Sequence, residues 1–219
     1  PIIFHSLSTV ILAQADRTMI TWLRSSADTG IYSLAYQFGM VPQVFTTTFE
    51  NIWIPWFSVK MQFNDKMEIK RMVKPYINTV ALLCCGIMLV APEVLKLMTT
   101  EAYHSAAYII SPVVLGIFLM FIASVSIDLE YYLKKTKTIA INTVIAAIVN
   151  LIANYLFIPR YGAMAAAYTT VASYAVSFFM HYCVVKKIEP NLFEFKIYIV
   201  PLVITILFSI TSNILMDQI

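Results

Sequence analysis

The sequence predicts an all-α fold, a polytopic bundle of about seven transmembrane helices in a single domain over residues 1–219. Apolar runs recur from end to end of the chain, and each is close to the roughly 20 residues that a helix needs to cross a bilayer. Hydrophobic residues make up 60% of the chain and charged residues 12%, with a mean hydropathy of +0.77. A soluble domain carries about 25% charged residues and could not cover so much apolar surface.

Each predicted helix is an apolar run that ends where charged or turn-forming residues gather. The second run contains Pro42 and Pro55, which permit a kink. The sixth opens with Gly162 and a series of alanines, and small residues four apart let helices approach closely. In chain order, the predicted helices cover Ile2–Leu23, Ile31–Phe57, Pro75–Leu97, Ser105–Ile127, Ile139–Ile158, Gly162–Val185 and Ile197–Met216.

Lysine and arginine predict the orientation of the chain, because cytoplasmic loops keep basic residues during insertion. The gaps after the second, fourth and sixth predicted helices hold most of them, and the other gaps hold only Arg24, Lys96 and Arg160. We therefore expect a multi-pass membrane protein with these three basic gaps inside. This bias explains the net charge of +3 without any nucleic acid partner. The basic gaps contain Lys60, Lys66, Lys70, Arg71, Lys74, Lys134, Lys135, Lys137, Lys186, Lys187 and Lys196.

Polar residues in the first predicted helix indicate a cavity. An ionisable side chain at the centre of a membrane helix costs about 2.5–3.5 kcal/mol, so Asp16 and Arg17 need a polar surrounding. Gln14, Arg17 and Thr21 recur, with Ser6, at spacings compatible with one helical face. The alternative is that Arg17 snorkels, since it lies only about 9 Å from the predicted helix end.

The second predicted helix carries another polar stripe, in which Glu50 lies well inside the span. Glu50 is expected either to take up a proton or cation in a cavity or to pair with a neighbouring donor. The stripe consists of Gln43, Thr46, Thr47, Glu50 and Asn51.

The fifth predicted helix places Asn150 and Asn154 one turn apart, with Asn142 near the same face. Asparagines at such positions join membrane helices by hydrogen bonds of about 0.6–2 kcal/mol. Contact with a sugar is the other interpretation.

The chain shows no phosphate-binding loop and no Ser/His/Asp arrangement, and its predicted outside loops are short, so we do not expect an enzyme. Asp128 and Glu130 form an acidic pair at the inner end of the fourth predicted helix. We expect that pair to be a solvated helix end beside Lys134 and Lys135.

No metal or cofactor is expected. The cysteines fall inside predicted helices as packing residues, and the histidines are isolated from one another, so neither set has the spacing of metal ligands. These residues are Cys84, Cys85, Cys183, His5, His104 and His181.

Several stretches together resemble a known transporter family. DRTMI at 16–20 with DTGIYSLAY at 28–36 is similar to the junction of the seventh and eighth spans of Wzx-type polysaccharide flippases, which belong to the multidrug/oligosaccharidyl-lipid/polysaccharide exporter superfamily. APEVL at 91–95 with Tyr103 resembles the ninth-to-tenth span junction of that family. Asn150, IPRYG at 158–162 and AAAYTT at 165–170 resemble its eleventh and twelfth spans.

The resemblance covers most of residues 1–190 and implies a MATE-like transporter of two helix bundles, of which this chain is the C-terminal half. It implies that a lipid-linked oligosaccharide, usually joined to undecaprenyl diphosphate, moves from the inner to the outer leaflet of a bacterial cytoplasmic membrane. In that setting Arg17 is the candidate contact for the diphosphate. Asp16 and Glu50 are the candidates for ion coupling. The remaining candidates for the substrate cavity are Gln14, Thr21, Gln43, Thr47, Asn150 and Asn154.

The chain departs from the family in length, because family members carry about six spans before this region. The first predicted helix begins directly on Pro1 without the basic segment of a signal peptide, which suggests a chain cut from something longer. We therefore expect it to associate with the missing N-terminal half or with itself, as well as with membrane lipid. The alternatives are a multidrug or organic cation antiporter of the same superfamily, against which Arg17 argues, and a membrane-embedded polymerase or ligase of polysaccharide assembly.

Overall fold

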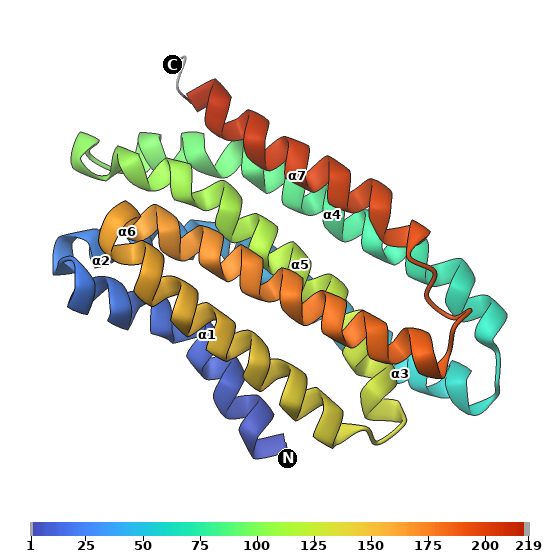
Figure 1. Ribbon diagram of the computed structural model, residues 1–219. Coiled ribbons are helices and arrows are strands. Elements are labelled where there is room, and N and C mark those ends of the chain that lie inside the picture. The colour runs from blue at the N-terminus through green and yellow to red at the C-terminus, as the bar shows by residue number, and fades with distance from the viewer. Residues whose placement is uncertain (1, 217–219) are drawn as a thin grey trace.

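The computed structural model describes residues 2–216, which form an all-α bundle of elongated helices packed side by side (Figure 1). Within those residues no strand occurs, so the predicted fold class is confirmed. In chain order the elements are α1 (Ile2–Leu23), α2 (Ser26–Gly39), α3 (Val41–Gln62), α4 (Lys66–Met98), the 3-10 helix η1 (Glu101–Ala106), α5 (Ala107–Tyr132), α6 (Thr136–Ile188) and α7 (Lys196–Met216).

Four segments of the described chain are long and apolar enough to cross a membrane: 66–98, 101–132, 136–188 and 196–214. A chain with several such segments is a multi-pass membrane protein. Helices α1 and α3, at 22 residues each, have the length to span but are less apolar than these four. Both of them contribute residues to the cavity described below, Gln14 and Arg17 from α1 and Gln43 from α3.

The 53-residue helix α6 is a hairpin of two antiparallel arms. A straight helix of that length would run about 80 Å, well over twice the roughly 30 Å of a bilayer core. The chain reverses at Gly162, whose φ of 64° and ψ of −147° are not helical. Figure 1 shows the two arms, 136–161 and 163–188, lying side by side. The arms correspond to the two predicted helices, Ile139–Ile158 and Gly162–Val185, except that Gly162 itself forms the turn between the arms instead of opening the second helix.

Gly162→Ala should destabilise the protein by about 1–3 kcal/mol, because that combination of φ and ψ is almost restricted to glycine. An added Cβ would also lie 3.4 Å from Arg24 Nη2, where Arg24 reaches across to the hairpin. Thermal unfolding in lipid nanodiscs measures the effect. Gly86→Ala is the matched control, since Gly86 is a helical glycine with open space around it and alanine there favours the helix. Equal melting temperatures for Gly162→Ala and the wild type would contradict the strained turn.

The predicted single helix over 31–57 is wrong, because the structure divides this segment into α2 and α3 at Met40. Pro42 lies in the first turn of α3, where its missing N–H removes no helical hydrogen bond. Gly39 ends α2 against α5, where an added Cβ would lie 2.6 Å from Val113 Cγ1. The break brings Met40 and Gln43 to the wall of the cavity.

Helix α5 is the centre of the bundle and is buried along nearly its whole length. It packs against α2, α3, α4, α6 and α7, whereas α1 packs against α2 and α6. No close backbone contact joins the described parts of α1 and α5. The space between those two helices is therefore where a cavity can form.

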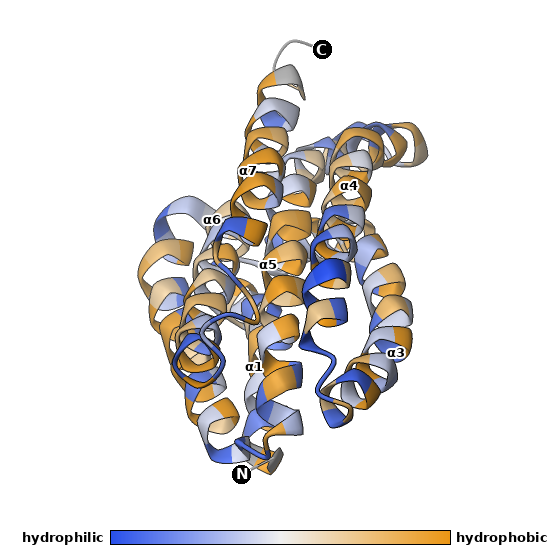
Figure 2. Cartoon of the chain, turned by 90° about the vertical axis from the view of Figure 1, so that its right-hand side faces the viewer, coloured by the Kyte–Doolittle hydropathy of each residue, from blue (hydrophilic) through white to orange (hydrophobic). Residues whose placement is uncertain are grey.

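The basic loops gather at one end of the bundle, which Figure 2 shows facing the viewer. Lys66 Nζ bonds Glu189 Oε1 at 2.7 Å and so joins the start of α4 to the loop after α6. Lys60 Nζ donates to Asp65 Oδ2 at 2.8 Å, and this bond lowers the pKa of the Asp65 carboxyl. Such an arrangement agrees with one basic face, although which side of the membrane it faces stays a prediction.

Candidate functional site

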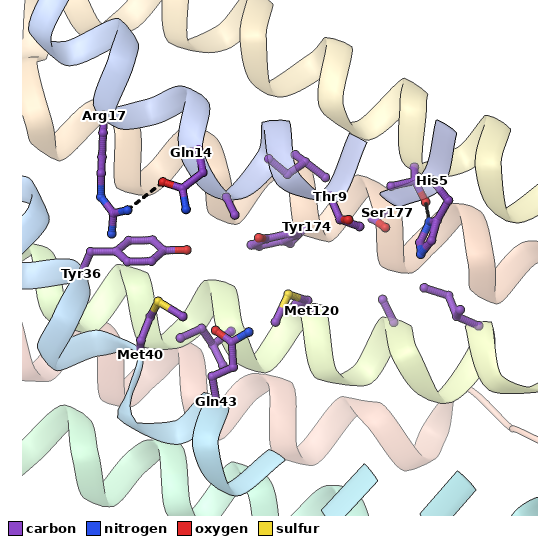
Figure 3. Close-up of a pocket in the computed structure, with 16 residues that line it drawn as sticks. His5, Thr9, Gln14, Arg17, Tyr36, Met40, Gln43, Met120, Tyr174 and Ser177 are labelled. Carbon is purple, nitrogen blue, oxygen red and sulfur yellow. Dashed lines mark hydrogen bonds between the residues drawn. The ribbon is translucent and has the colours of Figure 1, made fainter. Parts of the chain in front are cut away.

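A cavity of about 240 Å³ lies between α1, the α2–α3 break, α5 and both arms of α6. Figure 3 shows Arg17 and Gln14 toward one end of this cavity and His5 toward the other. Apolar groups that line it include Leu12, Met120 and Ile117. The polar and aromatic side chains that line it are His5, Thr9, Gln14, Arg17, Tyr36, Gln43, Thr143, Tyr174 and Ser177.

Arg17 is held in place while most of its donors stay free. Its Nη1 donates to Gln14 Oε1 at 2.9 Å, and its guanidinium carbon lies 4.7 Å from the centre of the Tyr36 ring. Its Nε is buried without a partner among the described residues, and no described carboxylate forms an ion pair with it. A fixed, charged fork with unused donors is suited to a bidentate oxyanion such as a phosphate.

Asp16, the neighbour of Arg17, points away from the cavity into a buried hydrogen-bond network. Its Oδ2 accepts from Tyr32 Oη at 2.6 Å and from Thr170 Oγ1 at 2.7 Å, and its Oδ1 accepts from Asn154 Nδ2 at 2.7 Å. Asn154 Nδ2 also donates to Asn150 Oδ1 at 3.1 Å. The network therefore ties α1 to α2 and to both arms of α6.

Thr169 and Thr170 complete this network from the second arm of α6. The Thr169 hydroxyl donates to Asn154 Oδ1 in a short contact, and Asn150 Nδ2 donates to Thr170 Oγ1 at 3.2 Å. Asp16 is 1% exposed, and Asn150 and Asn154 are fully buried. Three neutral donors hold this carboxylate inside the protein without any cation.

Glu50 of α3 faces α5, where Ser124 Oγ donates to its Oε1 at 2.6 Å. The charge of Asp128 on α5 is close enough to interact with that of Glu50. The rings of Trp53 and Tyr76 stack beside them at 4.5 Å between centroids. This second acidic site lies away from the cavity that Arg17 lines, because none of its residues borders that cavity.

Glu130 and His181 form a third ionisable group, and here two predictions from the sequence are wrong. Both side chains are fully buried, and His181 Nδ1 lies 2.6 Å from Glu130 Oε1. We predicted that Glu130 would be a solvated helix end and that His181 would be isolated. The physical reason for the difference is that α5 and the second arm of α6 turn these side chains toward each other, away from the exposed Lys134 and Lys135.

The sequence contains a signal for the buried position of His181. Small or apolar residues precede and follow His181 at intervals of four, namely Ser173, Ser177 and Val185, and all of them are buried. A helix with this spacing places all four side chains on one face, so the buried position of His181 could have been predicted. Its partner, 51 residues away in the sequence, could not.

The structure divides the predicted cavity residues into three sets. Gln14, Arg17 and Gln43 line the cavity. Thr21 and Thr47 do not line it; Thr21 Oγ1 bonds Thr29 Oγ1 at 2.7 Å, and Thr47 Oγ1 donates to the Gln43 carbonyl at 2.8 Å. Asn150 and Asn154 lie in the Asp16 network instead. There they join helices by hydrogen bonds, which was one of the two interpretations of these residues.

Comparison with known proteins connects the first part of the chain to polysaccharide synthesis. Residues 1–61 match the family model described as polysaccharide biosynthesis protein. The matched segment holds α1, α2 and nearly all of α3, which include Arg17, Gln14 and Gln43. No curated protein and no solved structure matches the chain.

Proposed function

We propose that the chain takes part in moving a lipid-linked oligosaccharide across the bacterial cytoplasmic membrane, with the sugar joined to a polyprenyl diphosphate. The observation that carries the proposal is Arg17, an arginine with free donors at the wall of an intramembrane cavity, within the segment that matches a polysaccharide biosynthesis family. An arginine unpaired by any carboxylate is costly inside a membrane unless an anion or water reaches it.

The cavity has both polar and apolar walls, as the headgroup of such a lipid requires. Arg17, Gln14 and Gln43 supply donors at one end, where a diphosphate would accept hydrogen bonds. Met40 and Met120 supply flexible apolar surface beside them. At about 240 Å³ the cavity holds a headgroup fragment rather than a whole repeat unit, so the sugars would extend beyond it.

We propose that ion coupling involves Asp16 and Glu50. Both carboxylates lie within the bundle and are held by hydroxyl or amide donors rather than by a cation. The Asp16 network spans α1, α2 and both arms of α6, so a change in its charge would alter how these elements pack. The cavity wall formed by α1 would move with it.

We further propose that a second helix bundle covers the α1–α3 side. Gln14, Thr21 and Thr47 are exposed on this side, and in hydrocarbon the Gln14 amide nitrogen would lack an acceptor. Transporters built from repeated bundles place substrate between the bundles and rock one against the other. The partner is an N-terminal half of the same transporter type or a second copy of this chain.

The experiment that tests the proposed function is complementation in a bacterial strain that lacks its lipid-linked oligosaccharide flippase. The chain together with the proposed N-terminal bundle should restore surface polysaccharide, and the chain alone should not. Membrane expression of both polypeptides is the control. Full restoration by the chain as a demonstrated monomer would contradict the two-bundle proposal, and no restoration by the co-expressed pair would contradict the transport proposal.

Export of organic cations is a second candidate, favoured by the acidic site at Glu50. Glu50 and Asp128 supply negative charge, and the stacked Trp53 and Tyr76 rings supply aromatic faces that attract cations. Ethidium efflux from the same cells separates the two functions. Efflux that is lost in Glu50→Gln but unaffected by Arg17→Ala would favour this candidate.

A further inference from the structure

We propose that Glu130 and His181 form a proton-binding site that exchanges protons with the cavity through His5. The inference deepens the proposed function by naming the proton as a coupling ion, and it rests on that function only for the role of the site in transport. The pair is separate from Asp16 and Glu50, and its helices α5 and α6 form two walls of the cavity.

The hydrogen bonding of the Glu130–His181 pair is that of a proton-binding site. A structural salt bridge would have all of its polar atoms bonded. Both side chains are fully buried, and only one bond, from His181 Nδ1 to Glu130 Oε1, joins them. Glu130 Oε2 and His181 Nε2 are buried without a hydrogen-bond partner among the described residues. A buried ion pair is stabilising when its remaining polar atoms are also bonded, and here they are not.

The cavity reaches the neighbourhood of the pair at its His5 end. Ser177, one helical turn before His181, lines the cavity together with His5 and Thr143. His5 Nδ1 bonds Thr143 Oγ1 at 2.8 Å, and the charges of His5 and His181 are close enough to interact. His5 is half-buried, so its ring can exchange protons with water that enters the cavity.

The other ionisable groups near the Glu130–His181 pair interact with different partners or are exposed. From α5, Asp128 interacts with Glu50, and the Tyr131 ring packs edge-on against His5 at 6.1 Å. From α7, Tyr198 packs against Tyr182 of α6. The lysines at the ends of the adjoining helices are exposed: Lys134, Lys135, Lys186 and Lys187.

The proton step conserves atoms and charge. In the one-proton state, a single proton is shared between the Glu130 carboxylate and the His181 imidazole. On release, the proton passes to the neutral imidazole of His5 and from there to water in the cavity, which leaves a carboxylate and a neutral His181 ring. Uptake is the reverse. Net charge within the bundle thus changes by one, which alters the packing preference of α1, α5 and α6.

The test is a titration of the full chain, labelled with nitrogen-15 histidine, in lipid nanodiscs. With only three histidines in the chain, His5→Gln, His104→Gln and His181→Gln assign the signals. The His181 signals should change once as the pH is varied, and Glu130→Gln should move or abolish that change. His104→Gln is the matched control, because His104 lies at the opposite end of the bundle in η1, and it should leave the step unchanged.

Two results would overturn the site. One is a His181 ring that keeps a single protonation state across the whole range, and the other is a step that Glu130→Gln leaves in place. If Glu130→Gln does not fold, infrared absorption of isotope-labelled glutamate in the wild-type chain replaces it, and a carboxyl band that is constant where His181 titrates would overturn the pair. No transport is measured in this experiment, so failure of the proton site and failure of the proposed function are distinguishable.

Discussion

Arg17→Ala should reduce the initial rate of lipid-linked oligosaccharide flipping by at least about tenfold, since charge-assisted hydrogen bonds contribute about 1.5–3 kcal/mol each. The guanidinium is held by Gln14 and Tyr36 with donors left free, so the substitution removes the charged contact and leaves the Gln14 amide without its partner. The measurement is flipping in proteoliposomes that contain both proposed bundles.

Arg17→Lys and Arg160→Ala are the control variants for the Arg17→Ala measurement. Lysine keeps the charge and loses the planar fork, so Arg17→Lys should retain part of the rate. Arg160 is an exposed arginine near the α6 turn that does not line the cavity, so Arg160→Ala should flip at the wild-type rate. A well-expressed Arg17→Ala protein with normal flipping would leave snorkelling to the headgroups as the better account of this residue.

Asp16→Ala should destabilise the protein by several kcal/mol, the largest stability effect that we expect of any single substitution, because each buried donor left unsatisfied costs about 1–3 kcal/mol. It removes the acceptor of the Tyr32 hydroxyl, the Thr170 hydroxyl and the Asn154 amide, all of them in buried surroundings. Buried donors left without acceptors account for the size of the effect. Thermal or detergent-induced unfolding of the purified protein measures it.

The matched control is Asp28→Ala, because Asp28 is partly exposed and pairs with Arg24 at 3.5 Å on the surface. Surface pairs of this kind contribute about 0–1 kcal/mol, so this variant should unfold close to the wild type. Asp16→Asn should fall between the two, since it keeps one carbonyl acceptor and introduces a donor that faces other donors. If Asp16→Ala is as stable as Asp28→Ala, the network does not hold α1 against α2 and α6.

Much of the helical order could be predicted from the sequence, because the membrane imposes length and hydropathy on each helix. The first helix coincides with its predicted range, Ile2–Leu23, since its apolar run ends at Arg24 and Ser25 provides the N-cap of the next helix. The division at Met40 was missed. A proline such as Pro42 permits a kink within one helix and is equally suited to the first turn of a new one, where the structure places it.

The candidate site could be predicted only where it depends on one helix. Gln14 and Arg17 were found because a spacing of three places them on the same face. The partners of Asp16 could not be predicted, because Asn154 and Thr170 lie 138 and 154 residues away and meet Asp16 only after the α6 hairpin has packed against α1. The same holds for Glu130, which periodicity alone could not connect with His181.

The central claim is that the Arg17 cavity binds a diphosphate-linked lipid, and binding measured by native mass spectrometry of the detergent-solubilised protein tests it most directly. Undecaprenyl diphosphate and undecaprenol share a tail, so a difference between them reports the headgroup alone. We predict that the wild-type protein retains the diphosphate and not the alcohol, that Arg17→Ala loses the preference, and that Arg160→Ala keeps it. Equal retention of the two lipids by the wild-type protein, or an unchanged preference in Arg17→Ala, would contradict the account.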